Sequence, residues 1–156
     1  MILERLSREP YRLTMRRGSA RIGTVPDAVQ VGPKVCLINK YSASDGDLFP
    51  WGFRALGLGK LIGTRTWGGI VGFRGSLPYM DGTDIRVPFF TSFDPKTGSW
   101  IIENHGVDPD ILIDNDPVKE WNGEDQQLDR AIQEVMKELQ NRKPLPGVPT
   151  PRDFSK

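Results

Sequence analysis

The sequence is poor in several features that would point to a class of function. Cys36 is the single cysteine, which excludes an intrachain disulfide, and His105 is the single histidine. Lys and Arg total 21 against 20 Asp and Glu, so a net charge of +1 gives no reason to expect nucleic acid or an anionic membrane as a partner. No apolar run approaches the length of a membrane span, and Met1–Arg5 lacks the apolar stretch of a signal peptide.

The length and composition of the chain indicate one globular domain. The chain has 156 residues, of which 37% are hydrophobic and 26% charged, enough to bury one core but too few to argue for two. We predict a domain over residues 1–141 and an extended or disordered tail over residues 142–156, which contain four prolines. Cys36 lies inside an apolar run, so we expect a structural thiol, in keeping with a reducing compartment.

Apolar periodicity in the first half of the chain is typical of an α/β fold. The helical spacing in Met1–Glu9 predicts the last turns of a helix, whereas residues 16–33 are predicted to be an irregular connection. The strand–helix–strand pattern predicts a largely parallel sheet. Its elements are the strand Lys34–Asn39, the helix Asp45–Leu56 and the strand Leu61–Gly63. A further strand, Tyr11–Met15, is predicted before them.

The second half of the chain is predicted to add antiparallel strands and a final helix. Turn signals at Asp81-Gly82 and Pro95–Gly98 separate the predicted strands, which are Ser76–Met80, Asp84–Thr91 and Ser99–Glu103. An amphipathic helix is predicted over Leu128–Leu139, with Glu124 or Asp125 near its start and its apolar stripe as a docking face. The fold class predicted is therefore α/β, with a mixed sheet and a C-terminal amphipathic helix.

Ser44 falls on the turn between the buried strand and the first long helix. Such a turn exposes a short side chain beside the first helical N–H groups, that of Asp45 above all, which are unpaired and face the same point. These N–H groups are what a developing oxyanion needs. The simpler alternative is that Ser44 is only a helix N-cap.

Two motifs near this turn do not indicate a cofactor or a metal. The glycine-rich segment Thr66–Gly72 lacks the lysine and the spacing of a phosphate loop. Asp45-Gly46-Asp47 lacks the further oxygen ligands and the closing glutamate of a calcium loop. We therefore predict no cofactor and no metal.

Three motifs, in order and at compatible spacings, resemble the catalytic core of tricorn-type proteases. These enzymes belong to the tail-specific, or C-terminal processing, serine peptidases. The resemblance extends from about Met1 to Leu139 and rests on the segments Asn39–Asp47, Gly57–Gly69 and Glu103–Asp110. It implies part of the α/β core shared by the ClpP and crotonase group.

The resemblance implies a role for individual residues. Ser44 matches the nucleophile that forms the acyl-enzyme, Asp45 the residue whose backbone N–H supplies half of the oxyanion hole, and Glu103 the glutamate that completes the catalytic tetrad. The Arg65–Gly69 loop contains no lysine, so a serine–lysine dyad is disfavoured.

Within that loop, Trp67, Gly68 and Gly69 are the predicted substrate-binding residues. Glycine permits close approach of backbones, and the glycine-flanked Trp67 is placed to form a wall of a peptide groove. The simpler alternatives are that Trp67 is a core residue and that Glu103 is a solvated carboxylate at a strand end.

The general base has no counterpart in this sequence. Tricorn-type proteases place a serine–histidine pair and a glycine-rich oxyanion segment well upstream of the nucleophile. His105 lies two residues after Glu103, at a position that the family fills with varied residues, so we do not assign it as the base. A serine without a base is a poor nucleophile, so this chain alone is expected to be almost inert. We favour a C-terminal portion of a longer peptidase over a natural truncation.

Three functions are compared at this stage. The resemblance implies a serine peptidase acting on a peptide substrate, in the cytoplasm and as a homo-oligomer, a hexamer in tricorn. The alternative is an inactive homologue that serves as a peptide-binding or assembly module, with Ser44 only a cap. An acyl-CoA enzyme of the crotonase fold is weaker, because those enzymes do not use a nucleophilic serine in this setting.

Overall fold

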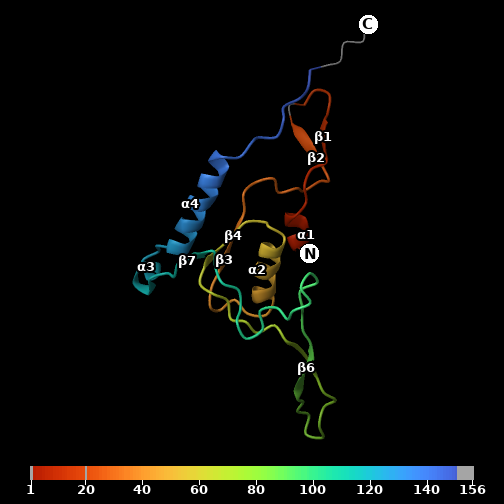
Figure 1. The fold of residues 1–156 in the computed structure, drawn as a ribbon, viewed down its shortest axis with the longest axis vertical. Helices are drawn as coiled ribbons and strands as arrows, with labels where there is room; N and C mark the ends of the chain where they lie inside the picture. Colours follow the sequence, from red (N-terminus) through yellow and green to blue (C-terminus); the bar gives the residue numbers. More distant parts are fainter. Residues whose placement is uncertain (1, 20, 151–156) are drawn as a thin grey trace.

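A computed structural model describes residues 2–19 and 21–150, and it shows an α/β fold (Figure 1). Helices and strands occur from Ile2 to Gln140. In order they are α1 Ile2–Leu6, β1 Arg12–Met15, β2 Ile22–Val25, β3 Val35–Ile38, α2 Asp45–Ala55, β4 Lys60–Gly63, β5 Gly72–Gly75, β6 Arg86–Phe90, β7 Ile111–Leu112, α3 Pro117–Trp121 and α4 Gln126–Gln140.

A three-stranded parallel sheet forms the centre of the molecule. Its order is β3-β4-β7, with Cys36 opposite Leu61 and Ile62 opposite Ile111. Helices α2 and α4 lie on opposite sides of this sheet (Figure 1). The predicted strand–helix–strand unit and its parallel pairing are therefore confirmed, with element bounds within one residue of those expected. Parallel and antiparallel strands lie in separate sheets here, rather than in the one mixed sheet predicted.

The main core lies between α2 and the sheet. Ile38, Phe53, Leu61 and Val107 are almost completely buried and contact one another, and α1 packs against them through its leucines. Burying side chains of this size contributes roughly 1.5–3 kcal/mol each. The end of β3 and the body of α2 are thus fixed, so the turn that joins them is anchored at both ends.

Helix α4 is confirmed as an amphipathic helix, and Asp125 is its N-cap. The Asp125 carboxylate accepts a hydrogen bond from the Leu128 N–H at 2.9 Å. The predicted apolar stripe is only partly covered within the described residues, because Ala131 is buried whereas Leu128, Ile132 and Met136 are about half exposed.

The buried side of α4 contains a carboxylate instead of a purely apolar stripe. Glu134 is 2% exposed and pairs with Lys60 of β4 and with Arg130 one turn earlier on the same helix. The hydrogen bond from Lys60, followed by that from Arg130, lowers the pKa of Glu134. A buried charge needs such partners, and Lys60 links α4 to the sheet through this one.

Two antiparallel hairpins extend at opposite ends of the molecule (Figure 1). β1 pairs with β2. The prediction of an irregular connection over residues 16–33 was therefore wrong, because that range contains β2. β5 pairs with β6 and confirms the antiparallel extension, but its first strand is Gly72–Gly75 and not Ser76–Met80. Residues 76–80 lead into the closing turn instead, where the Tyr79 N–H bonds the Thr83 carbonyl at 2.7 Å.

The predicted strand Ser99–Glu103 is also wrong. Only Trp100 pairs, in an isolated bridge with Phe93. Glu103 lies in a turn instead, which is closed by the Gly106 N–H donating to the Ile102 carbonyl at 2.8 Å.

The remaining expectations concern the ends of the chain and the membrane. Residues 142–150 contain no helix or strand, and Met1 and residues 151–156 lie outside the described residues. Over 2–19 and 21–150, no helix is both long enough and apolar enough to cross a lipid bilayer.

Candidate active site

Ser44 occupies a strained position at the start of α2. It is exposed, with φ 56° and ψ −111°. An ordinary serine N-cap has an extended backbone. A non-glycine residue in a sparsely populated conformation costs about 1–3 kcal/mol and persists only when its surroundings impose it. Ser44 is the N-cap of α2 and forms a capping box with Asp47, but capping alone does not account for its unusual backbone conformation.

The Asp45 N–H is available beside this serine. The next amides are used, since the Gly46 N–H donates to the Ala43 carbonyl at 2.8 Å and the Leu48 N–H to the Ser44 carbonyl at 2.9 Å. Within the described part of the chain, the Asp45 N–H has no acceptor. A free N–H at a helix N-terminus, next to an exposed hydroxyl, can stabilise negative charge that develops on a substrate oxygen.

Asp47 was not predicted as a site residue, and it is the most connected side chain in this region. It is 0% exposed. Its Oδ2 accepts hydrogen bonds from the Ser44 N–H at 2.8 Å and the Gly69 N–H at 3.2 Å, and its Oδ1 accepts one from the Gly68 N–H at 2.7 Å. The turn that carries Ser44 is thereby tied to the glycine-rich segment 66–71.

Glu103 holds the other end of the same segment. Its Oε2 accepts hydrogen bonds from the Ile70 N–H at 2.7 Å and the Val71 N–H at 3.0 Å. The neighbouring Asn104 N–H donates to the Gly68 carbonyl at 2.7 Å. Ser44 and Glu103, 59 residues apart in the sequence, are thus joined to one short segment, and Glu103 is not the freely solvated carboxylate of the simpler alternative.

Glycine is required where this segment crosses the Glu103 turn. Gly68 and Gly106 have φ of 87° and 84°, in the left-handed region. A Cβ on Gly68 would collide with the backbone of Gly106 and lie 2.8 Å from the His105 nitrogen. The two backbones therefore pack directly against each other.

The three predicted substrate-binding residues differ in exposure. Trp67 is 67% exposed and its ring covers Gly69, where an added Cβ would meet the indole. Its N–H donates to the Ser42 carbonyl at 2.9 Å, two residues before Ser44. Because Asp47 takes the N–H groups of Gly68 and Gly69, these two glycines have no amide left to offer a peptide, and Trp67 is the member of the set with a free surface.

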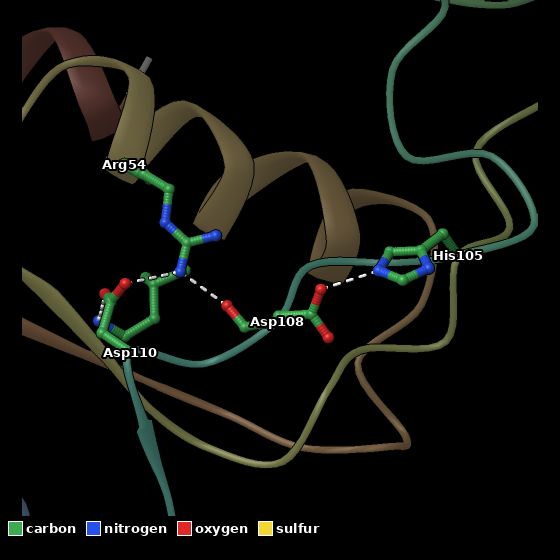
Figure 2. A network of polar contacts seen from close by, with 5 residues as sticks. Arg54, His105, Asp108 and Asp110 are labelled. Atoms are coloured by element: carbon green, nitrogen blue, oxygen red, sulfur yellow. Dashed lines mark hydrogen bonds and ion pairs between the residues drawn. The ribbon is translucent and has the colours of Figure 1, made fainter.

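His105 is engaged with Asp108, as Figure 2 shows. Its Nε2 lies 2.7 Å from Oδ2 of Asp108, and both side chains are more than half exposed. Arg54 of α2 donates to the Asp108 carbonyl at 2.6 Å and to the Asp110 carboxylate at 2.8 Å. No hydrogen bond joins His105 to Ser44 in the described residues, so the structure supplies no base for the serine from this histidine.

An open, mainly apolar hollow of about 580 Å³ lies beside Glu103. Its lining includes Val71, Trp100 and His105. Over residues 2–19 and 21–150, no three His, Cys, Asp or Glu side chains gather closely enough to hold a metal ion.

An exposed serine on a strained turn between a strand and a helix, beside a free helical N–H, is an arrangement suited to a nucleophile. Comparison with known families gives the particular group. Residues 5–113 match Peptidase family S41, and the chain belongs to this family.

Tricorn proteases and their homologues are among the relatives of this chain. The chain is 42% identical over 126 residues to the tricorn protease of Thermoplasma acidophilum, 38% over 132 residues to tricorn protease homolog 1 of Streptomyces coelicolor, and 37% over 142 residues to a putative tricorn-like protease C-terminal subunit of Sulfurisphaera tokodaii. These alignments cover 81%, 85% and 91% of this chain but only 12%, 12% and 16% of the relatives.

A solved structure agrees with these relatives. The crystal structure of the tricorn protease superimposes with a TM-score of 0.81 at 38% identity, over 90% of this chain and 14% of that one. The resemblance drawn from the three sequence motifs is thus confirmed at the level of family and fold.

Proposed function

We propose that this chain carries the nucleophile half of a serine peptidase active site, with Ser44 as the nucleophile. The observation that supports this most directly is the exposed, strained Ser44 next to the free N–H of Asp45. Strain that the surroundings impose on an exposed serine serves no purpose in an ordinary helix cap, whereas it presents a nucleophile to a substrate.

The reaction would be acyl transfer from a peptide. The Ser44 Oγ attacks the scissile carbonyl carbon while a base removes the hydroxyl proton, and the carbonyl oxygen becomes an oxyanion that accepts a hydrogen bond from the Asp45 N–H. The amine leaves with a proton and an acyl-enzyme remains. Water then adds to the acyl carbon, and the acid is released as Ser44 regains its proton.

The base is proposed to come from outside this chain. His105 is paired with Asp108, so we propose that the chain is the C-terminal portion of a longer tricorn-like protease whose histidine lies upstream. Support comes from the share of the relatives that it spans, 12% to 16% of their length in the three alignments above. This chain alone would then be nearly inert.

The other site residues follow from the same proposal. Glu103 would act through the partner network of the nucleophile, and Trp67, with Gly68 and Gly69 behind it, would form one wall of the peptide groove. The hollow beside Glu103 would take an apolar substrate side chain. Residues 1–141 would belong to one catalytic domain with a ClpP/crotonase-like core, assembled as a homo-oligomer, a hexamer by resemblance, in the cytoplasm.

A fluorophosphonate probe tests the assignment in the full-length gene product. Wild-type protein is expected to be labelled once per chain, with the label on Ser44, and to hydrolyse peptides. Ser44→Ala should lose both, whereas Ser99→Ala, at an exposed serine of the 95–98 turn region, should lose neither. Absence of labelling in the folded wild type would overturn the proposal, and peptide binding without hydrolysis would then favour the non-catalytic module.

A further inference from the structure

We propose that Asp47 is a positioning residue that holds the nucleophile turn and the glycine-rich segment in one geometry. This inference rests on the proposed peptidase function. The three donors to its carboxylate come from both partners, namely Ser44 on one side and Gly68 and Gly69 on the other.

The burial of Asp47 makes the contact indispensable. The side chain is 0% exposed, so no bulk water can replace a hydrogen bond that is lost. Hydrogen bonds to a carboxylate are also stronger than those between neutral groups. A bond from the Ser44 N–H restrains the rotation about the Ser44 N–Cα bond, which is the torsion that is strained.

A simple capping role explains only part of this arrangement. A carboxylate at the third position of a helix that accepts from the N-cap N–H is common, and the Ser44 bond fits that pattern. The bonds to Gly68 and Gly69 do not, because these residues lie more than 20 positions further along the chain.

The connection continues beyond Asp47. Four consecutive N–H groups, those of residues 68–71, are divided between two carboxylates, two to Asp47 and two to Glu103. The segment therefore acts as a spacer whose two ends are fixed by the acidic groups of the proposed site. Movement of Asp47 would change the position of Ser44 relative to both the segment and Glu103.

Asp47→Asn is the informative variant, because it keeps the shape but leaves one acceptor oxygen. With that oxygen at the Oδ2 position, the amide group faces the Gly68 N–H, and two donors are brought together. We expect kcat of the full-length gene product, and its rate of fluorophosphonate labelling, to fall by about ten- to a hundredfold, with KM little changed.

Asp110→Asn provides the matched control. The Asp110 carboxylate also accepts a backbone N–H, from Leu61 at 2.7 Å, and pairs with Arg54, but it touches neither Ser44 nor residues 68–71. Both variants are expected to lower Tm, and only Asp47→Asn is expected to lower kcat below the melting range. Equal kcat in the two variants would overturn the role of Asp47.

The outcomes separate this inference from the proposed function. Unlabelled wild-type protein removes both, whereas labelled wild type with unchanged kcat in Asp47→Asn removes only the inference. Hydrogen exchange of the wild type gives a second measurement if the variant does not fold. The amides of Ser44, Gly68 and Gly69 should be protected and exchange together, and exchange of the glycine amides well before that of Ser44 would contradict the connection.

Discussion

The two hydrogen bonds of Glu103 can be separated from its charge by a pair of substitutions. Both bonds use Oε2, so the single amide oxygen of Glu103→Gln can accept from Ile70 and Val71 alike. A hydrogen bond to a charged group contributes about 1.5–3 kcal/mol and one to a neutral group about 0.5–1.5 kcal/mol, so weakening both bonds in a fully buried site would lower the free energy of unfolding by about 2–3 kcal/mol. Partial exposure of Glu103 moves the value toward about 1 kcal/mol.

Glu103→Ala leaves both donors without a protein partner. The buried Ile70 N–H should cost about 1–3 kcal/mol, while the half-exposed Val71 can be hydrated in part, so a total of about 3 kcal/mol is expected. Urea unfolding with a common m-value measures both variants. Equal losses for Gln and Ala would show that the charge, and not the two N–H bonds, carries the stabilisation, and our reasoning would be refuted. Under the proposed function, both variants should also lose activity.

Three further predictions concern stability and reactivity. The hydrogen bond from Lys60 lowers the pKa of Glu134 in the folded protein below its usual 4.5. The ionised carboxylate therefore stabilises the fold fully above pH 4.5, and this stabilisation is lost as the pH falls through the lower pKa of the folded state. Thermal unfolding from neutral pH to about pH 3 should show a weaker acid dependence in Glu134→Gln than in the wild type. Burial raises the pKa of the Cys36 thiol to about 11, so iodoacetamide should modify it slowly in the native state near neutral pH and rapidly in denaturant. Gly106→Ala combines positive φ with a backbone collision and should lower the free energy of unfolding by about 2–5 kcal/mol. At Gly98 φ is also positive but the space is open, so Gly98→Ala should lower it by about 1–2 kcal/mol. Urea unfolding of the two variants distinguishes these values.

The sequence predicts the elements of the central unit well, because their signals are local. An apolar run before a turn, followed by helical spacing, defines β3 and α2 and places Ser44 between them. The same holds for α4, whose N-cap Asp125 and apolar period are both visible in the sequence.

The errors occur where contacts across the chain override local preference. Gly72–Gly75 has weak strand propensity, but it pairs with β6, and the glycine at position 72 accommodates the ring of Phe90 opposite. The buried side of α4 carries the ion-paired Glu134, which apolar periodicity does not detect. The two-residue strand β7 is too short to be recognised without its partner β4.

In the candidate site too, the local features are predictable from the sequence and the long-range contacts are not. The position of Ser44 and the free N–H of Asp45 follow from the strand-to-helix turn, whereas the connection from Asp47 to Gly68 and Gly69 does not, since nothing local marks residues more than 20 positions apart as partners. One signal was available. An acidic residue three positions after Ser44 fits the capping box, which places Asp47 near the Ser44 N–H.

The strain at Ser44 gives a reason for a buried carboxylate next to the proposed oxyanion site. Holding the serine backbone in its unusual conformation costs about 1–3 kcal/mol, and a charge-assisted hydrogen bond from its N–H to Asp47 contributes about 1.5–3 kcal/mol, enough to offset it. The carboxylate of Asp47 accepts hydrogen bonds from three N–H groups and that of Glu103 from two, so neither is without donors near the proposed oxyanion position. Residues of this chain thus maintain the geometry of the Ser44 turn. Among residues 2–19 and 21–150, no side chain is hydrogen-bonded to the Ser44 hydroxyl as the base that the proposed function requires.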